Sequence, residues 1–474
     1  MAGGGPKKPA IPATETDFDL VVVGGLNATA LLKFLQAGEA RYKMAIVTDS
    51  SKFVLPETYF TCMHEHIPLL KLESATVTAQ VEAWSRANVG SRVTEYKPHE
   101  NKLVLSNGQT YSYKALVLNP GFDHKSANLS GLLDFENEDR GENRVWGHVI
   151  DSKQRVVRNR YHGWNHPAGD MICYSPAHPY KGEGTDFYAF YYEHFLRQDQ
   201  LQGRSSRSAK IQYWSPNKVI SKFPYMNEVM LDECHKRGIE VHLGWELQKI
   251  AYNTIGEKIA TFKCVESGKI IEKPFISANI NPPSRPHAEL VSSGIASADG
   301  TIDVNKYTLQ SKKFENIFAF GDVVGFDTTR TQQGAVAQNP VVKHNVSQFL
   351  DGKELNAIYD GYQYMPLYLG HSYGTSFAHT HDFEPAPMNH WVPHYGVFSN
   401  AWFKRFTKDS QKAADKYTSF KKNDGPPHYN FKARYVPLQH NEYLQSKGVR
   451  PEEVKMFEPK VRVHDHHDDH HAHH

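Results

Sequence analysis

Short apolar runs and helical apolar spacing alternate at the start of the chain. Phe18–Val23 is an apolar run with the length of a buried parallel strand. Gly24-Gly25 follows it as a turn, and Met44–Val47 forms a second apolar run. The residues between them recur at helical spacing: Leu31, Leu32, Phe34 and Leu35. The pattern predicts strand, turn, helix and second parallel strand, which is the repeating unit of α/β proteins.

The turn in this unit has the outline of a dinucleotide-binding turn but keeps only the first of its three glycines. Gly24 fills the first place and is followed by Gly25, whereas Leu26 and Thr29 stand at the second and third places. Those two glycines let the backbone approach a pyrophosphate and let the helix pack on the strand. Asp49 follows the second strand, where an acid would bind a ribose hydroxyl. We therefore predict that the turn binds no dinucleotide tightly, with Gly24, Gly25 and Asp49 as its candidate contacts.

Composition argues against nucleic-acid-binding, disulfide-rich and membrane-spanning proteins. The 474 residues carry a formal net charge of +2 without a dominant basic or acidic run, which argues against a nucleic-acid partner. Four scattered cysteines do not make a disulfide scaffold. No apolar run reaches the length of a membrane-spanning helix, and the N-terminus lacks the apolar segment of a secretory signal.

Histidine pairs and a histidine-rich tail raise the question of a metal site. His64 with His66, and His379 with His381, stand two residues apart, as neighbours on one face of a strand would. Two ligands do not make a site, and the tail from His464 reads as a disordered polar end rather than a fixed ligand set. We expect no metal.

Several later stretches together resemble one family. They are "YKALVLNPGFD" at Tyr113, which places Gly121 in a Pro-Gly turn, the blocks Thr308–Asp322 and Tyr359–Gly370, and "ETYFTCMHEH" at Glu57. These resemble the flavin domain of sulfide:quinone oxidoreductases and of the flavoprotein subunit of flavocytochrome c sulfide dehydrogenase, in the pyridine nucleotide-disulfide oxidoreductase superfamily. The resemblance covers roughly Asp17 to Gly370.

The resemblance implies an α/β fold with two Rossmann-like domains of the FAD/NAD(P)-binding type and a C-terminal extension. The flavin-type domain would be split by the other. The strand "AKIQYWSP" in the inserted domain is followed by no glycine loop, so we expect no NAD. The expected segments are a flexible N-terminus (1–16), the first part of the flavin-type domain (17–159), the inserted domain (160–280), the second part of the flavin-type domain (281–370), an amphipathic docking region (371–425), and an extended arm with the histidine-rich tail (426–474).

The resemblance also implies places for a flavin. Gly321-Asp322 would bring a carboxylate to the ribityl and phosphate groups at the start of a helix, and the alternative for Asp322 is a cap on that helix. Arg330 stands where the family often has a lysine near the flavin ring, and a cation there would stabilise a reduced anionic flavin. Cys62 falls where the dehydrogenase carries a cysteine bound covalently to flavin. Two interpretations of Cys62 therefore stand. It either binds FAD covalently through its sulfur, or it is a buried core thiol without a role in flavin binding.

The cysteines that oxidise sulfide are missing from their expected places. In this family two cysteines carry the sulfur, and the chemistry needs thiolates. The first place falls on Lys181 or Gly182 and the second on Val323. The other cysteines lie in predicted strands or helices, where free thiols are usually core residues: Cys173, Cys234 and Cys264.

The region after residue 390 carries an aromatic stripe. Phe398, Trp402 and Phe406 recur four residues apart with Phe403 beside them, a pattern of helices that lie on a membrane or on a partner. The alternative is a helix packed on its own domain. The polar, proline-interrupted sequence that follows reads as an arm that wraps a neighbouring protein.

Together these features predict a sulfide:quinone oxidoreductase-like protein without its sulfide-oxidising cysteines. The leading hypothesis is a pseudoenzyme that serves as an accessory subunit of a mitochondrial inner-membrane respiratory assembly, attached peripherally, with other subunits as partners. The location rests on the resemblance alone. The alternative hypothesis is an active FAD-dependent enzyme that passes electrons to quinone from another donor, and a binder of sulfide or persulfide without turnover is a third.

Overall fold

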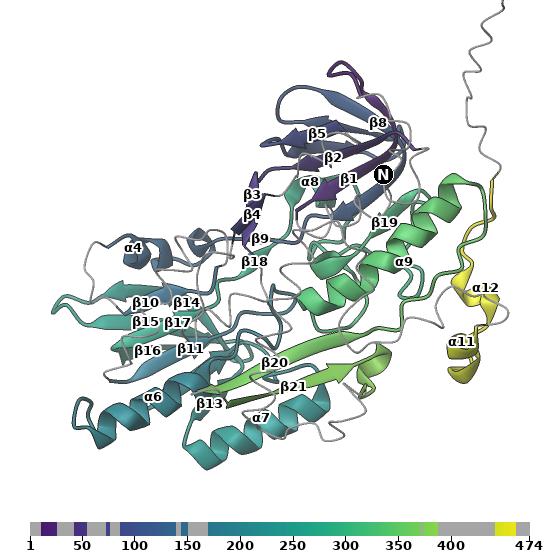
Figure 1. The fold of residues 1–474 in the computed structure, drawn as a ribbon. Helices are drawn as coiled ribbons and strands as arrows, with labels where there is room; N and C mark the ends of the chain where they lie inside the picture. The colour runs from purple at the N-terminus through teal and green to yellow at the C-terminus, as the bar shows by residue number, and fades with distance from the viewer. Residues whose placement is uncertain are drawn as a thin grey trace, which may run out of the picture.

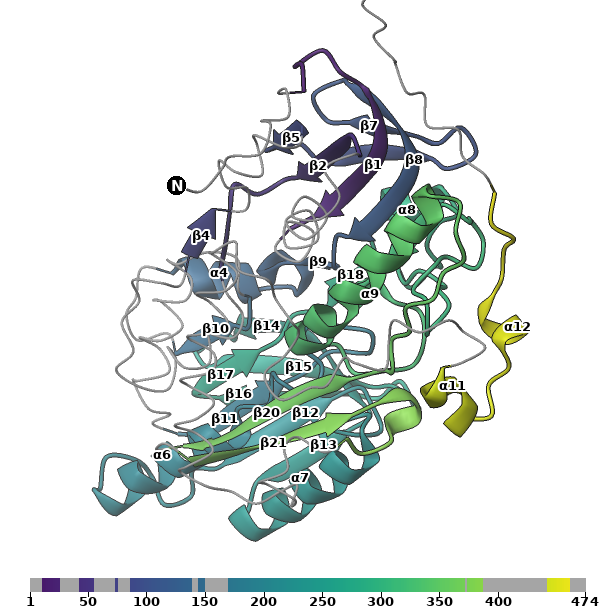
Figure 2. The ribbon, with the colours of Figure 1, turned by 45° about the vertical axis from the view of Figure 1, so that its right-hand side comes forward.

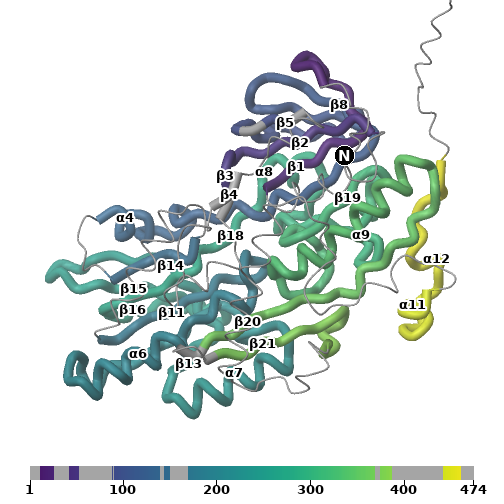
Figure 3. The backbone as a smooth tube through the Cα atoms, viewed as in Figure 1, coloured from purple at the N-terminus to yellow at the C-terminus, as the bar shows by residue number. Residues whose placement is uncertain are grey.

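The protein is built from two α/β lobes, which Figures 1 and 3 show one above the other. The computed structural model describes residues 11–25, 42–54, 73–75, 86–138, 144–149, 169–370, 373–386 and 441–460. The chain before residue 125 and the chain from about residue 284 to 360 build the first lobe, and most of the sequence between them builds the second. The fold class is the one that the resemblance implies, with two Rossmann-like α/β units.

The first lobe is organised by a seven-stranded sheet. Its strands are β1 (Asp17–Gly24), β2 (Met44–Thr48), β5 (Arg86–Val89), β6 (Val93–Lys97), β7 (Lys102–Leu105), β8 (Thr110–Asn119) and β19 (Ile317–Ala319). The order is β5-β2-β1-β8-β7-β6, and β19 also pairs with β8. β1 and β2 are parallel neighbours with Val22 opposite Ile46, so the strand pair predicted from the two apolar runs is confirmed.

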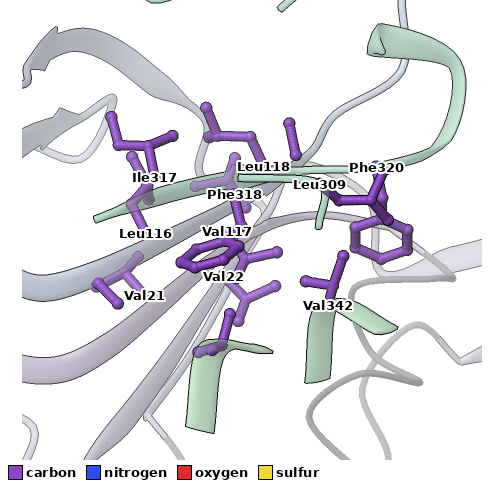
Figure 4. Packing of buried hydrophobic residues seen from close by; sticks show 14 of the residues in the cluster. Val21, Val22, Leu116, Val117, Leu118, Leu309, Ile317, Phe318, Phe320 and Val342 are labelled. Carbon is purple, nitrogen blue, oxygen red and sulfur yellow. The ribbon is translucent and has the colours of Figure 1, made fainter. Parts of the chain in front are cut away.

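Branched and aromatic side chains fill the core of this lobe. Val22 of β1 and Val117 of β8 are fully buried, as expected for parallel strands that are covered on both faces. Phe318 of β19 and Val342 of helix α9 (Gln332–Leu350) belong to the same cluster, part of which Figure 4 shows. This packing fixes the ends of β1, β8 and β19 at one edge of the sheet.

The second lobe contains a five-stranded parallel sheet and a three-stranded antiparallel one. The parallel strands are β10 (Val145–Gly147), β11 (Met171–Tyr174), β12 (Ile211–Ser215), β13 (Glu240–Leu243) and β17 (Ser277–Ile280), in the order β10-β17-β11-β12-β13. The antiparallel strands are β14 (Trp245–Tyr252), β15 (Lys258–Cys264) and β16 (Ile270–Phe275). Helices α6 (Ala189–Leu201) and α7 (Pro224–Arg237) connect the parallel strands. Pro224 opens α7, and Gly238, with φ of +67°, ends it.

A hairpin of strands β20 (Gln363–Gly370) and β21 (Tyr373–His379) joins the two lobes. β20 contacts both α6 and α9, and Met365 and Phe377 belong to the core of the second lobe. The hairpin crosses the segment boundary that we expected between residues 370 and 371.

Short elements complete the described fold. They are β3 (Lys52–Val54), β4 (Glu73–Ala75), β9 (Asp123–His124), β18 (Ser284–Arg285), α4 (Leu132–Asn137), α8 (Ala288–Ser292), and the 3-10 turns η2 (Ser126–Asn128), η3 (Gly321–Val323) and η4 (His381–Phe383). The C-terminal helices α11 (Glu442–Ser446) and α12 (Pro451–Val454) lie against the first lobe, as Figure 2 shows in yellow. Within the described residues no helix combines the length and apolar character that a membrane crossing needs.

Candidate functional site

Three chain segments meet at the carboxyl edge of the first sheet, where nucleotides bind in folds of this kind. Gly24 ends β1, Asn119 ends β8, and Gly321 follows β19. A Cβ atom on Gly24, where φ is +144°, would lie 2.2 Å from the backbone oxygen of Asn119. A Cβ atom on Gly321, where φ is +82°, would lie 2.4 Å from Asn119 Nδ2. Contacts within the protein are therefore sufficient to require both glycines, whether or not a phosphate approaches them.

The same edge is open at two other predicted positions. A Cβ atom on Gly25 or on Gly121 would meet no atom within 4 Å among those of the structure. Asp49 lies exposed directly after β2, at the place that the sequence predicts. Among the described residues, no atom therefore lies where a side chain at either glycine would begin.

Asp322 lies in the 3-10 turn η3 and is half-buried. Burial raises the pKa of its carboxyl group, and Glu183 adds to this, whereas Lys181 and Arg330 oppose it. The alternative interpretation, a cap on the following helix, is wrong. Phe320 caps η3, and α9 begins only at Gln332 with Thr331 as its N-cap. Asp322 therefore caps neither η3 nor α9.

Arg330 is committed to a buried ion pair. Its Nη1 atom donates to Glu183 Oε1 at 2.9 Å, and the two side chains are 4% and 1% exposed. Nε donates to the backbone oxygen of Asp322 at 2.7 Å, and Nη2 to that of Val324 at 2.9 Å. Burial alone would raise the pKa of Glu183, but Arg330 and His178 outweigh burial and hold that pKa below its usual value. The pair links the loop after β11 to the loop before α9.

The N-terminus of α9 is filled by the protein itself. Gln363 Oε1 of β20 accepts hydrogen bonds from Thr331 N at 3.1 Å and from Thr331 Oγ1 at 2.8 Å. Thr331 Oγ1 in turn accepts from Gly334 N at 3.1 Å. A Cβ atom on Gly334 would lie 2.1 Å from Gln363 Oε1, so the amide sits tightly against the helix end. The positive end of the helix dipole therefore already faces an acceptor.

The two positions where the family's cysteines were expected lie close together. Glu183, two residues after Lys181, contacts Arg330, and Arg330 contacts the residue before Val323. Lys181 is half-buried and Val323 is fully buried. A lysine, a valine and an ion pair therefore stand at this point of the fold.

The cysteines within the described residues lie elsewhere, in the elements that the sequence predicts. Cys173 lies in β11 and Cys234 in α7, both buried. Burial raises the pKa of both thiols, that of Cys234 to about 12. Cys264 is half-buried in β15, where hydrogen bonds to Ser267 lower the pKa of its thiol. The two buried thiols behave as core residues.

The crevice of the second sheet is filled by a polar cluster. Asp186 accepts hydrogen bonds from Ser175 Oγ at 2.6 Å and from Asn281 Nδ2 at 2.9 Å, and Asn281 Oδ1 contacts His124 Nε2 of the first lobe at 2.8 Å. Burial raises the pKa of Asp186 to about 6.

We expected no NAD because no glycine loop follows the strand "AKIQYWSP", but this strand is not the central one of the five-stranded sheet. "AKIQYWSP" is β12, whereas β11 lies in the middle of the sheet between β12 and β17. The turn that corresponds to a nucleotide loop is therefore residues 175–188. The absence of NAD stays a prediction.

The described histidine pair does not lie on one strand face. His379 ends β21 and His381 lies in η4, so they are not strand neighbours. His379 Nε2 contacts Thr329 Oγ1 at 2.8 Å, and His381 Nε2 contacts the backbone oxygen of Tyr359 at 3.0 Å. Burial lowers their pKa values to about 4 and about 3. Within the described ranges, no three histidines, cysteines or acids lie close enough to hold a metal ion.

Several predicted residues lie outside the described residues: Leu26, Thr29, Cys62, His64, His66, Phe398, Trp402, Phe403, Phe406 and the tail from His464. Two residues of the site, Glu183 and Gln363, were missed in the sequence analysis. The sequence offers only a weak signal for Glu183, a lone acid between two glycines in "KGEG".

A flavin nucleotide would meet two different surroundings here. At its nucleotide end it would meet Gly25 and Gly121, where no described atom lies within 4 Å of a built Cβ atom, and the carboxylates of Asp49 and Asp322, which are the kind of group that accepts hydrogen bonds from ribose and ribityl hydroxyls. At its ring end, Arg330 is paired with Glu183, and the N-terminus of α9 is hydrogen-bonded to Gln363. Both groups would therefore stabilise the negative charge of a reduced flavin ring less than unpaired groups would.

Solved structures of two known proteins have a similar fold. A chain of the Tetrahymena thermophila mitochondrial ATP synthase superposes with a TM-score of 0.79 at 22% identity, covering 89% of this chain and 100% of that one. The sulfide:quinone oxidoreductase of Aquifex aeolicus superposes with a TM-score of 0.65 at 13% identity, covering 86% and 92%. These likenesses show a shared fold, which is that of the FAD/NAD(P)-binding oxidoreductases.

Comparison of sequences shows which curated proteins the chain resembles. No protein-family model matches the chain. The mitochondrial sulfide:quinone oxidoreductase of Schizosaccharomyces pombe is 26% identical over 284 residues, covering 59% of each protein. The chain spans about three fifths of the length of the curated relatives it matches. The resemblance predicted from the sequence is confirmed, and the chain is a divergent relative of sulfide:quinone oxidoreductases.

Proposed function

We propose that this protein does not oxidise sulfide and serves as an accessory, structural subunit of a mitochondrial inner-membrane assembly. The observation that carries the proposal is the buried Arg330–Glu183 pair beside Lys181 and Val323. In a sulfide-oxidising relative this region would have to present two thiols to the flavin. Here it is closed by an ion pair that ties the lobes together.

The proposed assembly is one of the energy-converting complexes of the inner membrane, and an ATP synthase is the leading candidate. The superposed Tetrahymena thermophila chain, matched over its full length, supports membership of such an assembly. The relatives named as mitochondrial support the location. The attachment is peripheral, and Phe398, Trp402, Phe403 and Phe406 face other subunits or the membrane.

We place the proposed flavin site at the carboxyl edge of the first sheet. A flavin, where it is retained, is held at Gly24, Gly25, Asp49, Gly121, Gly321 and Asp322, with Cys62 as a covalent attachment. Arg330 is the one predicted contact that the ion pair argues against. We propose neither NAD nor a metal as a cofactor.

The alternative is an FAD-dependent enzyme that passes electrons to quinone from a donor other than sulfide. The open space at Gly25 and Gly121 beside two acids favours it. Flavin content separates the two functions. An accessory subunit tolerates an empty pocket, whereas this enzyme needs one flavin per chain, released by denaturation or retained on the precipitate through Cys62.

The purified protein is expected to show no sulfide-dependent reduction of a quinone analogue. The reason is that thiolates are the only side chains that carry out this sulfur chemistry, and Lys181 and Val323 cannot replace them. The measurement is quinone reduction with and without sulfide, beside an active sulfide:quinone oxidoreductase as the positive control. Sulfide-dependent turnover that disappears in Cys173→Ala or Cys62→Ala would show that another cysteine supplies the thiolate.

A further inference from the structure

Three basic residues from three separate segments gather at the carboxyl end of strand β17. His148 follows β10, Lys181 lies in the loop after β11, and His124 ends β9 of the first lobe. His148 N donates to the backbone oxygen of Ile280 at 2.7 Å. Asn281 Nδ2 donates to the backbone oxygen of Lys181 at 3.3 Å, and Asn281 Oδ1 contacts His124 Nε2 at 2.8 Å. All three segments are therefore fastened to the same two residues.

The charges of these three bases act on one another. His148 is buried, and burial is the main cause that lowers its pKa to about 3, while His124 and Lys181 lower that pKa further. Lys181 also opposes the rise that burial causes in the pKa of Asp322. Glu136, an acid close to this place, accepts a backbone N–H of β10 at 2.8 Å. Because the bases are partly or fully buried, their repulsion is less screened than it would be in water.

The place in the fold is one where ligands bind. β11 and β17 are neighbours in the middle of the parallel sheet, with β12 on one side and β10 on the other, so the strand order reverses between them. In open α/β sheets ligands bind beyond the carboxyl ends of the strands at this point. Asp186 is bonded there to Ser175 and Asn281, so the polar groups inside the crevice are bonded to one another. The groups that can attract a ligand are therefore the bases at its margin.

We propose that Lys181, His124 and His148 form a binding site for a small oxyanion of the phosphate type. An anion among them would replace their mutual repulsion with attraction. Ammonium and imidazolium groups donate charge-assisted hydrogen bonds to anionic oxygens, and these are stronger than neutral ones. A phosphate carries acceptor oxygens on several sides, which suits donors that come from three segments of two lobes. The site goes beyond the proposed function, since it requires neither sulfide chemistry nor a partner subunit.

The test uses the purified full-length protein with inorganic phosphate as the probe, measured by titration calorimetry at constant ionic strength. We expect saturable binding of one phosphate per chain. Lys181→Gln should weaken binding roughly tenfold, because it removes a charge-assisted hydrogen bond. His124→Gln alters the other lobe. Its amide can still donate to Asn281 but carries no positive charge, so this variant should also bind phosphate more weakly.

Lys125→Gln is the matched control, since Lys125 adjoins His124 but lies exposed in an ion pair with Asp123. It should bind phosphate as wild type does. The melting temperature without phosphate checks that each variant is folded, and Lys181→Arg, which keeps a cation, should bind phosphate more tightly than Lys181→Gln. A wild-type protein without saturable binding would overturn the site, and so would equal losses in Lys125→Gln and Lys181→Gln.

A second probe tests the size of the ligand. AMP carries the same phosphate group on a bulky nucleoside and should bind more weakly than phosphate. Binding of AMP as tight as that of phosphate would overturn the restriction to a small anion. A protein that binds phosphate through Lys181 but is found in no assembly would contradict the proposed function and support this site.

Discussion

Replacement of Arg330 by methionine is expected to lower the free energy of unfolding by roughly 3–5 kcal/mol. The variant leaves the Glu183 carboxylate, 1% exposed, without its counter-ion. It also removes donors from the backbone oxygens of Asp322 and Val324. Urea denaturation at pH 7 measures the change. A loss below about 1 kcal/mol would show that the pair does not stabilise this region.

The loss should grow with pH. In the wild type the pKa of Glu183 is held low, so its stabilising contribution is present above the unfolded value and is lost as pH falls through the folded value. Without Arg330, burial raises that pKa above the unfolded value, so the variant loses further stability as pH rises. Arg330→Met combined with Glu183→Gln should recover much of the loss, because no charge remains buried. Lys312→Met, which breaks the exposed ion pair with Asp303, is the matched control and should cost less than about 1 kcal/mol.

Gly24→Ala is expected to destabilise the protein by roughly 2–4 kcal/mol, from backbone strain and overpacking together. The new methyl group would lie 2.2 Å from the backbone oxygen of Asn119, at a φ of +144° that alanine rarely adopts. Because the obstacle is backbone, a change of rotamer cannot relieve it. Thermal or urea unfolding without added ligand measures the effect.

Gly25→Ala is the matched control, since its Cβ meets nothing within 4 Å. It should change stability by less than about 0.5 kcal/mol. If Gly24 served only the approach of a phosphate, Gly24→Ala would lower flavin content and leave the unliganded protein as stable as wild type. That outcome would contradict the packing role argued from Asn119.

The strands of the first unit could be predicted because their side chains are buried on both faces. Phe18–Val23 and Met44–Val47 read as continuous apolar runs for that reason, and they are β1 and β2. Cys173 was likewise placed in a regular element, and it lies in strand β11. Its place at the middle of the sheet could not be read, since strand order depends on how the chain crosses over and not on the apolar pattern.

The site was harder to predict because its main contacts join distant residues. Glu183 and Arg330 stand 147 positions apart, and neither belongs to a periodic pattern. Arg330 could be placed near the ring from the family resemblance, but its partner could not. For Asp322 the sequence left two interpretations, a flavin contact and a cap on the following helix. In the structure the helix starts later, since Thr331 supplies the cap and Gln363 covers the end.

The central claim is that this chain works as part of an assembly and not as a free-standing sulfide oxidase. Mild solubilisation of membranes followed by native sizing tests it most directly, with the protein detected in the sized fractions and the co-migrating subunits identified. We predict that the chain migrates in a complex many times its own mass of 53.9 kDa, together with subunits of an inner-membrane energy-converting assembly. A lone species of that mass, or a small homo-oligomer that reduces quinone with sulfide, would contradict the account.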